Sequence, residues 1–148
     1  MKPLAIEDVY IRETHARVRP DFDPLAASLD PAEAVGVQFR CAFEPNPKCD
    51  PHRVLFAVNT GVRVLKPGVS VAMQSPAEGE VVAEIDATFI VRYLSESGSP
   101  PSRKVLEAFQ DDVVQHLWPY WREYVQGAAA RLRLPPILLP VRPATGSK

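Results

Sequence analysis

Apolar and polar residues alternate over much of the first two thirds of the chain, which is the period expected of half-buried strands. The odd-numbered positions are apolar in 35–44, the even-numbered positions in 54–64, and the odd-numbered ones again in 81–93. The segment 4–18 is less regular, because charges fall on both of its faces, and we expect a strand there with a bulge or an exposed edge. The pattern therefore predicts four strands.

The connections between these strands contain no helical stretch of the roughly dozen residues that a parallel crossover needs. The sheet should therefore be an antiparallel meander. The 16 prolines cluster between the strands and near the end of the sequence, and they mark where strands stop, because proline removes a donor from the ladder. The connection 19–33, rich in Asp and Pro, is expected to cross over the sheet.

After the fourth strand the apolar spacing changes to three and four, the period of an amphipathic helix. Ser102 is expected to cap a helix whose apolar stripe covers 105–117. Pro119 is expected to end or kink that helix and to begin a second one, with a stripe over 120–132. Four strands followed by two helices predict an α+β fold with both helices on one face of the sheet. A length of 148 residues fits one domain, 1–148.

Composition excludes several classes of protein. Apolar residues make up 46% and charged residues 24%, as in globular proteins, and no apolar run approaches the roughly 20 residues that span a bilayer. The segment 1–8 has acids where a signal peptide needs an apolar run, so we expect a cytoplasmic protein with no membrane insertion. The net charge of −1 gives no overall attraction to nucleic acid.

No motif for a metal, a nucleotide or an activated nucleophile is present in the sequence. Glu84 and Asp86 fall on the same face of a strand, but a solvated polar face explains them better than acid–base chemistry. His116 follows Asp112 by four residues, which predicts a contact between them on a helix surface. We therefore expect no enzyme, no catalytic residue, no metal and no cofactor.

Aromatic residues are the candidates for binding, because an exposed set of them would provide apolar surface for an unfolded chain. The candidates lie on the second strand and around Pro119: Phe39, Phe43, Trp118, Tyr120, Trp121 and Tyr124. The alternative is that each is an ordinary residue of the core or of an oligomer interface.

Two segments of the sequence resemble the SecB family of protein-export chaperones. Residues 117–123 read Leu-Trp-Pro-Tyr-Trp-Arg-Glu, where the family has Leu-Phe-Pro-Tyr-x-Arg-Glu opening its second helix. Residues 134–141 read Leu-Pro-Pro-Ile-Leu-Leu-Pro-Val, where the family has Phe-Pro-x-Leu-x-Leu-x-Pro followed by Ile or Val. The second segment has one residue fewer before its last proline. Element order, spacing and total length also agree with the family.

The resemblance implies a four-stranded antiparallel sheet with two helices, assembled as a dimer of dimers. It implies a chaperone that binds non-native polypeptide without ATP and passes it to the export motor SecA. SecB-like relatives also serve as chaperones for aggregation-prone antitoxins. Glu13 and Glu84 keep two of the acids that face SecA in the family, whereas Arg17 has the opposite sign to the acid expected there.

The sequence thus favours a chaperone that holds unfolded polypeptide in apolar grooves, for export or for an antitoxin. The alternative is a small ligand-binding carrier or enzyme with one closed pocket between sheet and helices. A homo-oligomer is expected, because the apolar stripe over 105–117 and the apolar tail 134–141 exceed what is needed to cover one face of a four-stranded sheet.

Overall fold

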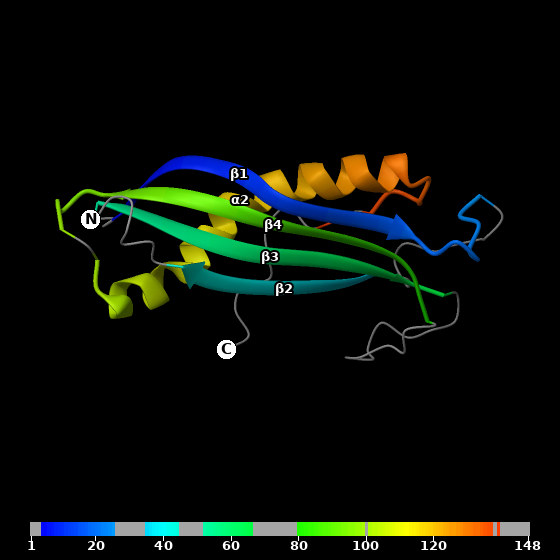
Figure 1. The fold of residues 1–148 in the computed structure, drawn as a ribbon, viewed down its shortest axis with the longest axis horizontal. Helices are drawn as coiled ribbons and strands as arrows, with labels where there is room; N and C mark the ends of the chain where they lie inside the picture. Colours follow the sequence, from blue (N-terminus) through cyan, green and yellow to red (C-terminus); the bar gives the residue numbers. More distant parts are fainter. Residues whose placement is uncertain are drawn as a thin grey trace.

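Four strands form one antiparallel sheet in the order β1-β4-β3-β2 (Figure 1). They are β1 (Leu4–Val18), β2 (Val35–Glu44), β3 (Arg53–Leu65) and β4 (Val81–Ser95). The computed structural model describes residues 4–25, 35–44, 52–66, 80–99, 101–137 and 139. Strands β2, β3 and β4 form a meander, and β1 pairs with β4, so the chain crosses between the two sheet edges after β1. The four predicted strands are confirmed, whereas most of the predicted crossing connection 19–33 lies outside the described residues.

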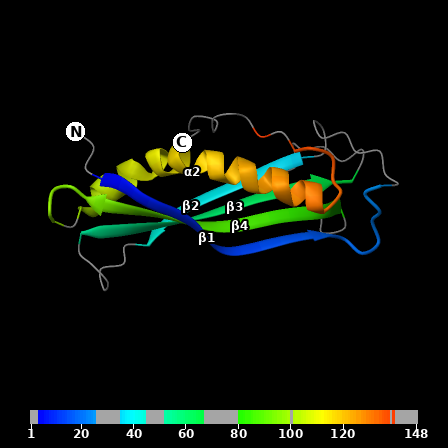
Figure 2. The same ribbon diagram turned by 90° about the horizontal axis from the view of Figure 1, so that it is seen from above.

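Within the described part of the chain, one helix, α2 (Arg103–Arg131), packs on one face of the sheet (Figures 1 and 2). It contacts β4, β3 and β2. Ser102 caps its first turn, and the Ser102 hydroxyl accepts a hydrogen bond from the backbone N–H of Val105, as predicted. The fold is therefore α+β, with an antiparallel sheet covered on one face by a C-terminal helix.

The prediction of two helices divided at Pro119 was wrong, because α2 continues through this residue. Proline in a helix interior removes a hydrogen bond and crowds the carbonyl four residues earlier, at a cost of about 3 kcal/mol. Leu117, Trp118 and Trp121 are buried on the sheet side of the helix, and each such side chain contributes roughly 1.5–3 kcal/mol on burial. Packing on both sides of Pro119 therefore offsets the local cost.

The core lies between the sheet and α2. Its centre is a set of edge-to-face aromatic contacts, in which Tyr93 packs against Phe56 and Phe109 with ring centroids 5.5 Å and 5.0 Å apart. Such pairs contribute roughly 0.5–1.5 kcal/mol beyond the area they bury. The even-numbered residues of β3 and the odd-numbered residues of β4 supply most of the remaining core, as their alternation predicts.

The chain reverses direction directly after α2. Arg133 adopts a positive φ of 59°, and the N–H of Leu134 donates to the carbonyl of Ala129, which closes the helix end. Leu134, Ile137 and Leu139 are buried in the same core as the sheet and helix. The apolar tail predicted to need a cover is thus covered at these three positions.

Two irregularities divide β1, one between Ile6 and Asp8 and one between Ile11 and Glu13. Each places one extra residue opposite β4 and so changes which β1 side chains face α2. Even-numbered residues face α2 before the first bulge, odd-numbered ones between the bulges, and even-numbered ones again after the second. The bulged strand predicted from the irregular pattern is confirmed.

Candidate functional site

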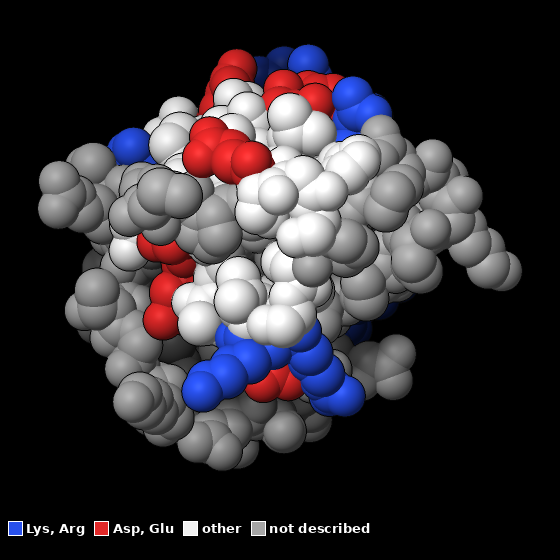
Figure 3. All heavy atoms as spheres, turned by 90° about the vertical axis from the view of Figure 1, so that its left-hand side faces the viewer, with Lys and Arg blue, Asp and Glu red and all other residues white. Residues whose placement is uncertain are grey.

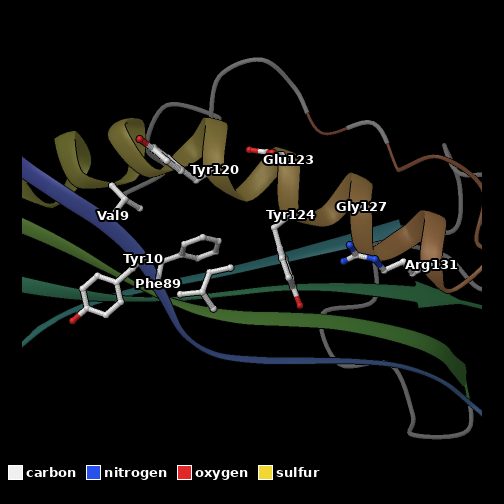
Figure 4. Close-up of a pocket in the computed structure, with 9 residues that line it drawn as sticks. Val9, Tyr10, Phe89, Tyr120, Glu123, Tyr124, Gly127 and Arg131 are labelled. Atoms are coloured by element: carbon white, nitrogen blue, oxygen red, sulfur yellow. The ribbon is translucent and has the colours of Figure 1, made fainter.

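An open apolar groove runs between β1 and the second half of α2 (Figure 4). Its volume is about 530 Å³. It exists because α2 lies over β4, β3 and β2 and leaves the inner side of β1 largely uncovered. We call it the β1–α2 groove. Its lining residues are Val9, Tyr10, Ile11, Phe89, Tyr120, Glu123, Tyr124, Gly127 and Arg131.

The helix wall of the groove follows one stripe of α2. Tyr120, Tyr124, Gly127 and Arg131 recur at spacings of four, three and four residues, so they lie above one another on the same side of the helix. Gly127 leaves a gap in this wall, because a β-carbon added there would meet no atom within 4 Å. The exposed ring of Tyr120 stands at the lip with 49% of its surface accessible.

The floor of the groove is formed by aromatic rings that pack against one another. Phe89 is buried at 2% exposure and packs edge-to-face against Tyr124, with ring centroids 6.3 Å apart. Trp121 packs against Phe89 at 6.2 Å from below and stacks on Tyr124 at 6.0 Å. Figure 4 shows Tyr124 extending from α2 toward the strands. The buried Trp121 therefore fixes the position of the two rings that a ligand would touch.

The strand wall is aliphatic and comes from the stretch of β1 between its two bulges. Val9 pairs with Val91 and Ile11 with Phe89, so both project toward α2. Ile11 is 40% exposed, a large fraction for an isoleucine in a sheet. Tyr10 pairs with Ile90 on the opposite face, and its ring points away from α2 in Figure 4.

Two charged side chains of α2, Glu123 and Arg131, line the groove. Glu123 and Arg131 are eight residues apart, about 12 Å along the axis at about 1.5 Å per residue. Both are exposed, and neither has an ion-pair partner among the residues that the structure describes.

The six predicted aromatic candidates divide into three groups. Tyr120 and Tyr124 line the groove. Trp118 and Trp121 are buried, at 5% and 0% exposure, so their prediction as exposed binding surface was wrong and the alternative, a place in the core, holds for them. Their indole rings lie on the sheet side of α2, where the helix period places positions 117, 118 and 121 together.

Phe39 and Phe43 form the third group. They lie in β2, paired with Thr60 and Phe56, and their side chains fall outside the described part of the chain.

No sequence pattern indicated the strand wall or the part that Phe89 plays in the floor. Val9 and Ile11 precede Phe89 by about 80 residues in the sequence, and only the β1–β4 register brings them together. The irregular apolar pattern of β1 was the available clue, because a bulge often re-aims a side chain near a functional site.

The opposite, outer face of the sheet is charged and internally paired. Glu84 is its centre: its carboxylate accepts from Arg17, lies 3.3 Å from the Arg63 guanidinium and 3.9 Å from His15. Arg63 also donates to Asp86 at 2.7 Å. Glu84 thus has arginine partners on both neighbouring strands, and both carboxylates are paired with arginines.

A glycine makes room for part of this network. Gly61 pairs with Asp86, and a β-carbon at Gly61 would lie 2.7 Å from the Asp86 carboxylate. The Asp86 side chain therefore lies across the glycine to reach Arg63 on the same strand as Gly61.

Glu7, the extra residue of the first bulge in β1, forms further ion pairs toward the other end of the sheet. The Glu7 carboxylate lies 3.1 Å from Arg53 of β3 and 3.1 Å from Arg92 of β4. At the end of the molecule where β1 begins, acidic and basic side chains adjoin one another around uncharged surface (Figure 3). The charges on this end therefore offer no continuous field of one sign.

The predicted acids have different surroundings. Glu13 is exposed on the same face as His15 and Arg17, and no ion pair to it is present among the described residues.

His116 is hydrogen-bonded through Nδ1 to the Tyr93 hydroxyl at 2.8 Å, a contact that the predicted pairing with Asp112 did not foresee. Within the described ranges, no three His, Cys, Asp or Glu side chains are grouped to hold a metal ion.

Comparison with known proteins gives one informative result. No protein-family model matches the chain, and no curated protein matches its sequence. Among solved structures, the chain is similar to the Mycobacterium tuberculosis Rv1957 SecB-like chaperone in complex with a ChAD peptide from the Rv1956 HigA1 antitoxin. The TM-score is 0.70 over 96% of this chain and 94% of that chain, at 21% sequence identity. The chain has a SecB-like fold.

The SecB-like fold agrees with the resemblance first seen in residues 117–123 and 134–141. The first of these segments lies in the middle of α2 and does not open a helix, which corrects the placement given to it from the sequence. No helix among the described residues is long and apolar enough to cross a membrane.

Proposed function

We propose that this protein is an ATP-independent molecular chaperone that binds unfolded or non-native polypeptide in the β1–α2 groove. The observation that carries the proposal is an aromatic and aliphatic groove left open because α2 does not cover β1. Its walls include Ile11 at 40% and Tyr120 at 49% exposure, and large exposed apolar side chains grouped in this way mark interaction sites. The SecB-like fold supports the same function.

The groove suits an extended chain better than a small ligand. A small-molecule site buries most of its ligand in a concave pocket with a few converging polar groups. Here the groove is open along one side, and its polar atoms are tyrosine hydroxyls and two charged groups at a distance from each other. This counts against the alternative of a ligand carrier or an enzyme with a closed pocket.

The test is light scattering of a denatured model client diluted into buffer without nucleotide, with and without this protein. We expect an equimolar amount of the wild-type protein to keep the client in solution. Tyr120→Ala should weaken this effect, because it removes the exposed ring at the lip of the groove. Glu13→Gln, on the outer face, is the matched control and should act as wild type does. Unchanged aggregation of several clients would refute the proposal.

Of the two partners considered, we propose an antitoxin-type client in preference to the export motor SecA. Glu84, one of the two acids expected to face SecA, is surrounded by Arg17, Arg63 and His15, which leaves little free negative charge on that face. The similar solved structure is a SecB-like chaperone in complex with a peptide from an antitoxin. Binding of purified SecA with micromolar affinity, measured by calorimetry, would reverse this order.

We further propose a homo-oligomer, with a dimer of dimers as the expected form. β1 is a 15-residue edge strand whose exposed side chains include Ile6 and Ile11, and long apolar edges are sites of strand pairing. A stable interface should bury more than about 1,000 Å². Multi-angle light scattering gives the native mass, and a monomer at micromolar concentration would contradict this part of the proposal.

A further inference from the structure

The two charged residues of the β1–α2 groove have no structural task among the described residues. Neither Glu123 nor Arg131 takes part in an ion pair there, in contrast to Glu84, Asp86 and Glu7 on the outer face. Both nevertheless line the groove, one at the level of Tyr120 and Tyr124 and the other one turn beyond Gly127. In Figure 4 the Arg131 guanidinium is directed back along α2 toward the groove.

The spacing of these charges matches a short length of extended chain. Glu123 and Arg131 are separated by about 12 Å along the helix axis at about 1.5 Å per residue. An extended polypeptide advances about 3.3 Å per residue, so about four residues cover that length. The surface between them is apolar or empty, because it consists of Tyr124, the gap at Gly127 and the floor ring of Phe89.

We propose that the groove selects polypeptide segments in which about three apolar residues are flanked by a basic residue on one side and an acidic residue on the other. The basic residue pairs with Glu123 and the acidic residue with Arg131, while the apolar residues lie over Tyr124 and Gly127. This inference rests on the proposed function and adds a client preference to it. Chain direction is not specified, because a flipped extended segment presents the same charges when its flanks are exchanged.

The test uses short fluorescein-labelled peptides with blocked ends and a constant Leu-Phe-Val core, with binding measured by fluorescence anisotropy. One peptide places Lys and Glu on opposite sides of the core, four positions apart. Others place Lys on both sides or Glu on both sides. A control of identical composition places Lys and Glu next to each other on one side. We expect the first peptide to bind about 3- to 10-fold tighter than each of the others, the range for two exposed ion pairs.

Two single charge reversals should redirect the preference. Arg131→Glu gives the groove two acidic ends and should favour the peptide with two Lys, whereas Glu123→Arg should favour the peptide with two Glu. The double variant Glu123→Arg/Arg131→Glu restores one charge of each sign and should regain the wild-type preference. Thermal unfolding of each variant, followed by circular dichroism, verifies that it is folded. Salt at 0.5 M should reduce every preference, because the pairs are exposed.

The outcomes separate the two proposals. Equal binding of all peptides by a protein that still suppresses client aggregation would overturn the charge preference and leave the chaperone function intact. A preference that is the same in the wild type and both single variants would also overturn it. Absence of both peptide binding and aggregation suppression would refute the chaperone function itself. Peptide binding that changes with the protein's association state, with no charge preference, would assign the groove to a second copy of the chain.

Discussion

The two faces of the sheet use charge and apolar surface in opposite ways. On the outer face, Glu84 and Asp86 are paired with Arg17 and Arg63, and a glycine at position 61 makes space for that pairing. On the inner face, beyond the reach of α2, apolar side chains of β1 stay exposed beside two tyrosines of the helix.

The contrast separates stability from binding. Satisfied charges and covered apolar groups lower the energy of the folded chain and leave little to offer a partner. Uncovered apolar groups and unpaired charges stabilise the folded chain less, and they remain available to bind a partner. The β1–α2 groove therefore has the properties of a binding surface, whereas the charged groups of the outer face are already paired within the chain. Substitutions in the two regions should affect different measurements.

The largest expected difference is between the floor and the lip of the groove. Trp121→Ala removes a fully buried indole and should lower the free energy of unfolding by about 3–5 kcal/mol. Tyr120→Ala, one residue earlier and 49% exposed, should change it by less than about 0.5 kcal/mol but weaken client binding. Urea denaturation measures the first effect and light scattering the second. Equal destabilisation by both variants would show that the lip belongs to the core.

The next effect concerns the centre of the outer face. The side chain of Glu84 is only 17% exposed, accepts a hydrogen bond from Arg17 and lies 3.3 Å from the guanidinium group of Arg63. Glu84→Gln should lower the free energy of unfolding by about 1–2 kcal/mol, because it removes the carboxylate that pairs with Arg17, whereas Arg63 keeps its pairing with Asp86. Client binding should not change. Glu13→Gln on the same face is the control and should be nearly neutral. A loss of aggregation suppression in Glu84→Gln would mean that the outer face also binds clients.

A smaller effect with two opposite signs is expected at Gly127. Gly127→Ala should raise the free energy of unfolding by about 0.5–1 kcal/mol, because alanine favours the helix and its methyl group enters empty space. The same methyl group narrows the gap between Tyr124 and Arg131, so client binding should weaken by a few fold. Gly127→Leu should abolish more of the binding at similar stability. A gain in both stability and binding would place the ligand elsewhere.

The elements that the sequence predicted correctly are those whose pattern is local. The alternation in β3 and β4 predicted both strands and their core faces, and Ser102 predicted the start of α2. It failed at Pro119, because the local preference of proline was outweighed by tertiary packing of Leu117 and Trp121 that a linear pattern does not contain.

The groove was only partly accessible from the sequence for a similar reason. Tyr120 and Tyr124 were identified because aromatic residues are chemically conspicuous. Val9 and Ile11 were not, because their role depends on two bulges that set the register of β1 against β4 and on a helix that stops short of β1. Long-range register and uncovered area are properties of the assembled sheet.

The smallest effect distinguishes an exposed ion pair from the network around Glu84. Arg19 donates a hydrogen bond to Asp21 just after β1, and this bond, more than any other contribution, lowers the pKa of Asp21 below its ordinary value of 3.8. A carboxyl whose pKa is lower in the folded state stabilises that state above its unfolded pKa, and this contribution disappears as the pH falls through the folded value. Asp21→Asn should therefore be slightly less stable than the wild type at pH 7, and the difference should disappear as the pH falls below 3.8 and through the folded pKa of Asp21. Urea midpoints measured at pH 7 and at successively lower pH give the comparison, and because Asp21 is exposed the difference should be much smaller than that of Glu84→Gln. A difference that persists unchanged at low pH would mean that the asparagine acts through the turn and not through the charge.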